Sequence, residues 1–518
     1  MSDTFDFLIV GASAAGCVLA DRLSADPAVR VALLEAGPDE DGPLLRCPAG
    51  AAWLARSGRA QWGFATVEQP GLNGRSVPLP RGKLLGGTEA VGDMVYSRGH
   101  PADYDRWAAE GNPGWAFADV LPWFERAEEA NPGIAEFAEP DPCSRAFLQA
   151  AQQAGHRLAD AALATDADGF ASQALMRRGG ERFGTAQARA TPARGRSNLV
   201  VLCGAHATRI LLEGRRAVGV EFGHEGYLKQ LRASREVLLC AGPLQSPQIL
   251  MLSGIGPHAH LVENGIATRH HLPGVGHGLQ DRSSVALRLR RPGMPHMPGG
   301  SPADLLRLWR AALAWRRHRT GPLTSNLLEV GGTLRSQAGE PLPDLALRLR
   351  LADSWSLRRS WPRRGDAIEV VVLRPRSQGR VSLDGKDPFA PPRIDPDYLG
   401  DRDDMDRLLQ GFRMARQLAA QPVLAALGGH ESPNSAGADA PLALEQFVRE
   451  QDVSGQAPVG SCRMGDGEMA VVDARLRVRG VAGLRVVDAS VLPGFLSGSP
   501  QAAAAMLAER AAAWVNDR

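Results

Sequence analysis

The hydrophobic pattern at the start of the chain predicts a βαβ unit. An apolar run, Phe5–Val10, ends at Gly11, and a second run, Val31–Leu34, closes on Glu35 after a helical segment rich in small residues. Gly11 would allow the tight turn from strand to helix, and Gly16 would let the helix pack closely on the strand. The free N–H groups at the start of such a helix suit a pyrophosphate.

The same unit carries a dinucleotide-binding fingerprint with one departure. Glu35 follows Gly16 by 19 residues, at the place where an acidic side chain hydrogen-bonds a ribose. Ser13 replaces the middle glycine of the G-x-G-x-x-G pattern, which leaves less room for the pyrophosphate. The alternative is an ordinary buried βαβ unit without a ligand. Strand, turn, helix and acidic residue in this order favour dinucleotide binding.

Composition narrows the class of protein. With 518 residues, 44% of them hydrophobic and 22% charged, the chain is long enough for two core-forming domains. Six widely spaced cysteines, without a C-x-x-C pair, argue against a disulfide framework and against a metal site. A net charge of +2 gives no reason to expect nucleic acid or membrane as a partner. No secretory signal precedes the first strand, so we expect a cytoplasmic protein that acts on a small molecule.

Four further segments carry long motifs. They are PRGKLLGGTEAVGDMVYSRGH at residues 80–100, GPLQSPQILMLSGIG at 242–256, LPGVGHGLQDR at 272–282, and VGSCRMG with LRVVDASVLPGFLSGSPQ near the C-terminus. Together they resemble the glucose-methanol-choline (GMC) oxidoreductases, which bind FAD and oxidise alcohols. The third segment departs from the family, because His277, Gly278 and Arg282 stand where the family usually has Glu, Asn and His.

The resemblance implies an α/β (α+β) fold, in which a Rossmann-like FAD-binding domain carries an inserted substrate-binding domain with a mixed or antiparallel sheet. The expected FAD-binding domain takes residues 1–150, 190–282 and 440–518, and the substrate-binding domain takes residues 151–189 and 283–439. FAD is the expected cofactor. The residues expected to hold it are Gly11, Ser13, Gly16, Glu35, Ala36, Gly86, Gly87, Gly92, Asp93, Ala207, Ala241, Gly242, Asp488, Ala489 and Gln501.

The resemblance also shows that the usual catalytic pair is replaced. In the family, the histidine of a His-Pro-Val-Gly-Thr-Cys segment is the base near the flavin, and here Ala457 stands in its place. Alanine can neither accept a proton nor orient a hydroxyl. The second active-site residue, Asn or His in the family, aligns with Gln501, which can hydrogen-bond a substrate but is not a base at neutral pH. Residues 80–100 resemble the first signature of the family, and in it Glu89 and Asp93 bring two carboxylates into a stretch that is normally neutral.

Two interpretations of these carboxylates stay open. In one, Glu89 and Asp93 are solvated or helix-capping residues, and the protein has lost its activity. In the other, Asp93 is a replacement base made more basic by burial, and Glu89 and Gln501 are further catalytic residues.

Leucine recurs at every second position over residues 345–351, and this alternation predicts a strand with one basic face. Ala346, Arg348 and Arg350 would share that face, and leucines would form the other. In the GMC family the corresponding strand turns its polar face to the substrate, so Arg348, Arg350 and Ala457 are the expected substrate residues, and an anionic substrate would suit them. A solvent-facing edge strand is the alternative.

The same arginines, with the missing base, support a non-oxidative lyase or decarboxylase as the alternative function. A basic amphipathic helix at residues 305–319 is expected to pack over the mouth of the pocket.

Overall fold

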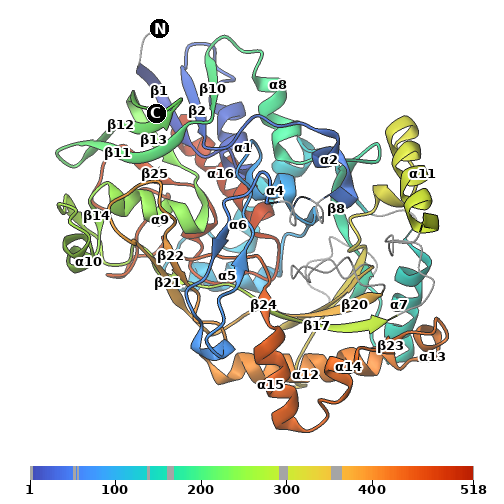
Figure 1. The fold of residues 1–518 in the computed structure, drawn as a ribbon. Helices are drawn as coiled ribbons and strands as arrows, with labels where there is room; N and C mark the ends of the chain where they lie inside the picture. Colours follow the sequence, from blue (N-terminus) through green and yellow to red (C-terminus); the bar gives the residue numbers. More distant parts are fainter. Residues whose placement is uncertain are drawn as a thin grey trace.

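The fold is organised around two large sheets, one at the upper left and one at the lower right of Figure 1. The computed structural model describes residues 4–50, 54, 58–136, 140–159, 168–290, 302–351 and 365–516. Each sheet has its own hydrophobic core.

The first sheet has the strand order β10-β2-β1-β13-β12-β11, with β25 paired to β13. Its parallel part consists of β10 (Leu199–Cys203), β2 (Val31–Glu35), β1 (Thr4–Val10), β13 (Tyr227–Leu239) and β25 (Leu484–Val486). The antiparallel strands β12 (Arg216–His224) and β11 (His206–Glu213) extend it beyond β13. In an open sheet of this kind, ligands bind outside the carboxyl ends of the parallel strands.

Helix α1 (Ala14–Leu23) lies between this sheet and α16 (Pro500–Asn516). The close approach of α1 to β1 depends on Gly16, because a Cβ at Gly16 would lie 1.9 Å from the carbonyl oxygen of Gly11. The buried face of α16 is made largely of alanines, which lets the two helices approach closely. Residues near the two ends of the chain therefore build one layer.

The second sheet has the order β23-β17-β20-β19-β18-β7, with β24 paired to β17, and all its pairs are antiparallel. The strands are β23 (His430–Glu431), β17 (Ser283–Arg290), β20 (Asp366–Val372), β19 (Leu345–Arg350), β18 (Val330–Leu334), β7 (Gly169–Ser172) and β24 (Val453–Ser454). Helix α12 (Arg402–Ala419) packs on one face, where the leucines of β19 join the core. Ala346 and Arg348 line a cavity on the other side, so the predicted facing of this strand is confirmed.

Shorter elements connect and cover these layers. The other helices are α2 (Pro43–Arg46), α4 (Gly87–Val91), α5 (Pro101–Ala109), α6 (Phe117–Glu129), α7 (Pro142–Gln153), α8 (Thr191–Ala193), α9 (Gly242–Leu252), α10 (His258–Glu263), α11 (Pro302–His318), α13 (Pro422–Ala425), α14 (Pro433–Ala436) and α15 (Pro441–Gln451). The other strands are β3 (Phe64–Ala65), β4 (Pro78–Leu79), β5 (Val95–Tyr96), β6 (Ile134–Glu136), β8 (Ala174–Arg178), β9 (Glu181–Arg182), β14 (Ile255–Gly256), β15 (His270–His271), β16 (His277–Leu279), β21 (Gly379–Ser382) and β22 (Arg393–Asp395).

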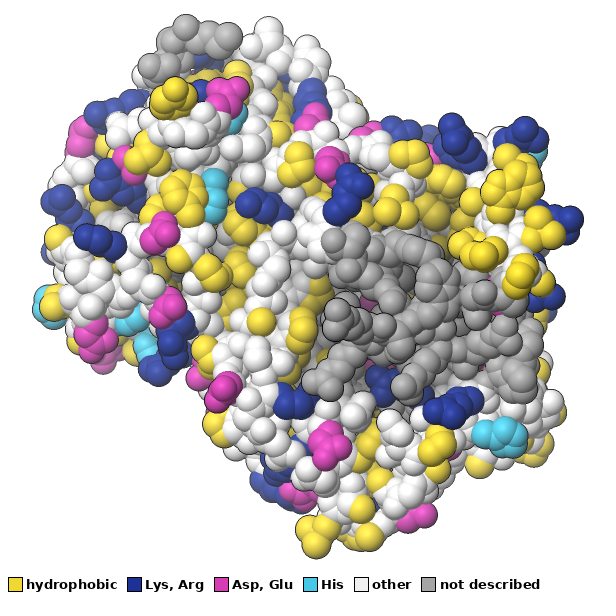
Figure 2. Space-filling model, viewed as in Figure 1, with side chains coloured by type: hydrophobic (Ala, Val, Ile, Leu, Met, Phe, Trp, Pro, Cys, Tyr) yellow, Lys and Arg dark blue, Asp and Glu magenta, His cyan; other side chains and the backbone are white. Residues whose placement is uncertain are grey.

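Helix α11 stands at the edge of the molecule. Figure 2 shows hydrophobic and basic side chains together in this region, and Leu305, Leu306 and Trp309 of α11 are exposed. Trp315 packs against Cys47 and Ala49. No described residue of α11 lines either of the cavities discussed below, so packing over the pocket mouth is not observed.

The predicted fold class is confirmed, since a Rossmann-like sheet and a separate antiparallel sheet are both present. The boundaries of the two domains stay a prediction. All six cysteines are free thiols. Among the helices that the structure describes, none is long and apolar enough to cross a bilayer, and the cytoplasmic location stays a prediction.

Candidate active site

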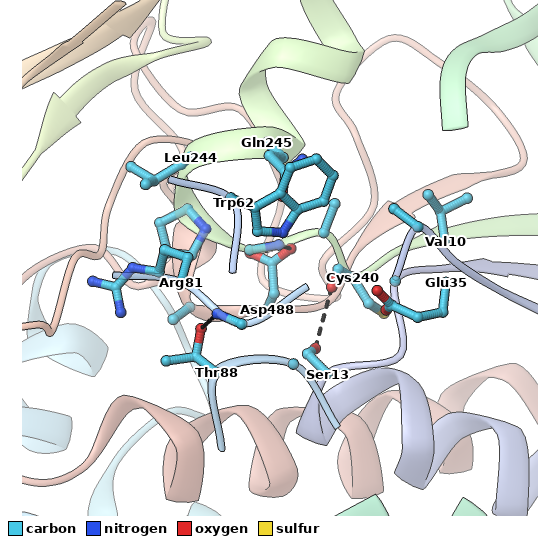
Figure 3. A pocket seen from close by; sticks show the side chains of 18 of the residues that line it. Val10, Ser13, Glu35, Trp62, Arg81, Thr88, Cys240, Leu244, Gln245 and Asp488 are labelled. Atoms are coloured by element: carbon cyan, nitrogen blue, oxygen red, sulfur yellow. Dashed lines mark hydrogen bonds between the residues drawn. The ribbon is translucent and has the colours of Figure 1, made fainter. Parts of the chain in front are cut away.

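A cleft of about 1200 Å³ opens at the carboxyl ends of the parallel strands (Figure 3). The predicted FAD residues that line it are Gly11, Ser13, Glu35, Ala36, Gly86, Gly87, Ala207, Ala241, Gly242, Asp488, Ala489 and Gln501. Gly16 supports helix packing instead, and Gly92 and Asp93 line an adjoining cavity.

The turn from β1 to α1 is shaped for a pyrophosphate. Gly11 has φ +100°, and a Cβ there would lie 2.6 Å from the carbonyl oxygen of Cys240. The first turn of α1 carries no acidic side chain that would oppose an anion. The hydroxyl of Ser13 donates to the Cys240 carbonyl at 3.2 Å, as the dashed line in Figure 3 shows. The hydroxyl is therefore held by the residue that follows β13, and the N–H groups of the helix start can serve the ligand.

Glu35 ends β2 at the edge of this turn. Its two carboxylate oxygens accept from the backbone N–H of Ala12 at 3.0 Å and of Gly37 at 2.8 Å. Burial raises the pKa of the Glu35 carboxyl to about 7, although these hydrogen bonds lower it. Each oxygen keeps accepting capacity, so the residue suits the hydroxyls of a ribose.

Asp488 joins the motif at residues 242–256 to the C-terminal segment. One of its oxygens accepts from Gly242 N at 2.9 Å and from Ser246 Oγ at 2.6 Å, and the other accepts from Ser490 N. Burial raises the pKa of the Asp488 carboxyl against these hydrogen bonds. The carboxylate thus holds the start of α9 next to β25, two elements that are far apart in the sequence.

An aromatic wall of the cleft was not predicted. Trp62 stacks on Phe64 with ring centroids 5.6 Å apart, His206 meets Trp62 edge-on, and Lys83 Nζ lies 4.4 Å from the Trp62 ring centroid. Burial, with the charge of Lys83, lowers the pKa of His206 to about 4, so the ring is neutral at pH 7. The only sequence signal was the richness in Trp, Gly and Pro of the long connection at residues 38–80.

A second cavity adjoins the cleft on the side of the antiparallel sheet. The residues that line both spaces are Thr88, Glu89, Gln456, Ala457, Pro500 and Gln501. The two positions at which the resemblance places a catalytic pair therefore meet at the junction between the spaces. A substrate in the second cavity would meet a cofactor in the cleft at this point.

A buried network fixes the backbone at Ala457. Its N–H donates to Asp281 Oδ1 at 2.8 Å. The other oxygen of Asp281 accepts from the hydroxyls of Tyr398 and Ser454. Because the Ala457 methyl offers neither donor nor acceptor, this well-held position contributes no acid–base chemistry.

Gln501 is the second residue of α16 and lies at the same junction. Its Oε1 accepts from Ser499 Oγ at 2.7 Å. Within the described part of the chain, its amide nitrogen makes no hydrogen bond and can donate to a ligand.

Glu89 is buried, which differs from the interpretation as a solvated residue. Its carboxylate accepts from the backbone N–H of Thr185 and, at 2.9 Å, from the Thr185 hydroxyl. Burial raises the pKa of the Glu89 carboxyl, against the effect of these two hydrogen bonds. Glu89 therefore ties the first signature to residue 185.

Asp93 lies in the second cavity, with its side chain 38% exposed, so the expected burial of this carboxylate is not observed. Its Oδ2 accepts from Arg350 Nη2 at 3.3 Å, and Glu369 contacts the same nitrogen at 3.2 Å. Burial alone would lower the pKa of Arg350, but the two carboxylates outweigh it and raise the pKa. Arg350 is therefore neutralised inside the protein, whereas Arg348 meets no carboxylate among the described residues.

The cleft and the adjoining cavity together are typical of an enzyme that holds a dinucleotide cofactor next to a cavity for a small molecule. Comparison with known families agrees: residues 5–284 and 375–508 match the models of the N- and C-terminal parts of the GMC oxidoreductases. An uncharacterised GMC-type oxidoreductase of Mycobacterium tuberculosis is 37% identical, with 99% of each chain covered. An alcohol dehydrogenase (acceptor) of Pseudomonas putida is 35% identical, over 98% of this chain and 95% of the relative.

Among solved structures, a formate oxidase of Aspergillus oryzae, in a variant studied for its FAD modification, superposes with a TM-score of 0.89. It is 26% identical, and the match covers 100% of this chain and 98% of that one. The chain belongs to the GMC oxidoreductase family. It is an FAD-dependent oxidoreductase of the kind that acts on CH–OH groups.

Replacement of Glu35 by alanine is expected to weaken FAD binding by about 1.5–3 kcal/mol, because hydrogen bonds to a charged acceptor are lost. Equilibrium titration of the apoprotein with FAD measures the effect. Asp39→Ala is the matched control, since Asp39 pairs with Arg194 at the surface and lies outside the cleft. Equal FAD affinity in Glu35→Ala and the parent protein would refute the ribose contact.

Proposed function

We propose that this oxidoreductase oxidises a CH–OH group of a small organic substrate with Asp93, in place of the usual histidine, as proton acceptor. The observation that carries the proposal is that Ala457 and Gln501 lie at the junction of cleft and cavity, while Asp93 is a carboxylate within the cavity itself. Asp93 is exposed to the cavity, whereas both oxygens of Glu89 are occupied by Thr185.

Each residue then has a distinct task. Arg350 holds the Asp93 carboxylate in one orientation from the far side. Asp93 takes the proton of the substrate hydroxyl, and the amide of Gln501 donates a hydrogen bond to the same oxygen. Glu89 ties α4 to Thr185 and takes no part in the proton transfer. The cofactor supplies the hydride acceptor when it is bound.

The residues that line the cleft are suited to FAD. The positive φ of Gly11, the free start of α1 and the carboxylate of Glu35 suit the pyrophosphate and the ribose. The aromatic wall and the glycine turn at Gly86 and Gly87 line the remainder of the cleft.

Anaerobic mixing of the FAD-loaded protein with a panel of alcohols and hydroxy acids tests the proposal. We expect at least one compound to bleach the visible flavin absorbance and to yield one carbonyl product per flavin reduced. Release of CO₂ from a carboxylic acid without any bleaching would favour the lyase or decarboxylase instead. The absence of both, in a protein with full flavin content, would indicate an inactive member of the fold.

A further inference from the structure

Arg348 stands out as an unpaired cation in the second cavity. It lies on β19, half-buried, and lines the cavity together with Ala346. Among the described residues it makes no hydrogen bond and no ion pair. Gly331, its partner in register on β18, has no side chain, and a Cβ there would lie 3.1 Å from Arg348 Cγ. The stem of Arg348 therefore packs over this glycine.

The nearby carboxylates are committed elsewhere. Glu369 is opposite Arg348 on β20, but its oxygens accept from Ser284 Oγ at 3.1 Å and from Arg350 Nη2. Asp93 also binds Arg350. Asp103 accepts from Arg374 Nε and from the backbone and hydroxyl of Ser497.

A second arginine adds to the positive charge. Arg282 is buried beside the cavity, and its Nη2 donates to the carbonyl oxygens of Leu496 and Gly498 at 2.6 and 2.8 Å. Its Nε is buried without a partner. Burial and then the charge of Arg348 lower the pKa of Arg282 to about 9, so it is still charged at pH 7. Asp281, the adjacent carboxylate, accepts from Tyr398, Ser454 and Ala457.

We propose that the substrate carries a carboxylate, which Arg348 binds through its guanidinium within the positive field of Arg282. Arg348 and Arg282 place two cations at this cavity, and the carboxylates described there, Asp93 and Glu89, already contact Arg350 and Thr185. An anionic ligand would stabilise the two cations. A guanidinium presents two parallel N–H donors that match the two oxygens of a carboxylate. This inference rests on the proposed function in taking the second cavity as the substrate cavity, and it narrows the substrate to a hydroxy acid.

Acetate is the probe, because it has the carboxylate but no CH–OH group and so binds without turnover. Isothermal titration calorimetry of the FAD-loaded protein, together with perturbation of the flavin spectrum, gives its affinity. We expect Arg348→Gln to weaken acetate binding by about 10- to 100-fold, as for the loss of a charge-assisted hydrogen bond. The acetate affinity of Arg348→Lys should lie between those of the parent protein and Arg348→Gln, because lysine keeps the positive charge but lacks the two parallel N–H donors of a guanidinium. The binding of ethanol, a neutral probe, should change little in either variant.

Arg288→Gln is the matched control, because Arg288 belongs to the same sheet, reaches Gln451 and does not line the cavity. The proposal is overturned if acetate does not bind to the parent protein, or if Arg348→Gln and Arg288→Gln bind it equally. Tighter binding of inorganic phosphate than of acetate would also overturn it, since the ligand would then be a phosphate. None of these outcomes depends on flavin reduction, so a failure of the proposed oxidation is recognised separately.

Discussion

Replacement of Asp93 by asparagine is expected to slow flavin reduction by the substrate about 10²- to 10⁴-fold, the usual loss when a positioned base is removed. The amide fills the same space and can still accept from Arg350, but it cannot take a proton at neutral pH. Stopped-flow mixing under anaerobic conditions measures the rate. FAD content should match that of the parent protein, because Asp93 lines the second cavity and not the cleft.

Glu369→Gln is the matched control for this variant. Glu369 is the other carboxylate on Arg350, and its side chain does not line the cavity. Its replacement disturbs the same ion pair but leaves the carboxylate of Asp93 in place, so we expect less than about a tenfold change in rate. A comparable loss in both variants would mean that the charge balance around Arg350, and not proton transfer to Asp93, controls the reaction.

Introduction of the usual pair, as Ala457→His with Gln501→Asn, is expected to raise the rate of flavin reduction by ethanol by about 10²-fold or more. Asp281 holds the backbone N–H of residue 457, a contact that does not depend on the side chain, and residue 457 lines both the cleft and the second cavity. The new histidine would supply a base with a pKa suited to neutral pH.

Gln501→Asn alone is the control, because it shortens the amide without adding a base. We expect it to leave the slow reaction with ethanol unchanged. If the double variant reduced its flavin no faster than this control, the shape and charge of the cavity, and not the missing base, would exclude simple alcohols.

Local sequence patterns were sufficient to predict those elements whose structure depends on residues close together in the sequence. The apolar runs around Gly11 and Gly16 predicted β1, α1 and β2, because a tight turn and a close helix leave few other solutions. The alternation of β19 likewise predicted which face carries Arg348, since successive side chains of a strand point to opposite faces.

The partners of the charged residues could not be predicted, because they come from distant parts of the chain. Arg350 contacts Asp93 across 257 positions, and Glu89 contacts Thr185 across 96. Alternation shows that Arg348 and Arg350 share a face but not that only Arg350 meets carboxylates there. The burial of Glu89 and the exposure of Asp93 also follow from this packing, which reverses the expectation that Asp93 is the buried carboxylate.

A crystal structure of the FAD-loaded protein is the most direct measurement of the central claim, that substrate and flavin meet at the junction of the two spaces beside Asp93. We expect the reactive edge of the flavin ring to lie at Ala457 and Gln501, with the carboxylate of Asp93 facing the space in front of it. A flavin ring that turns this edge away from the second cavity, or an Asp93 side chain that leaves the cavity once FAD is bound, would contradict the account.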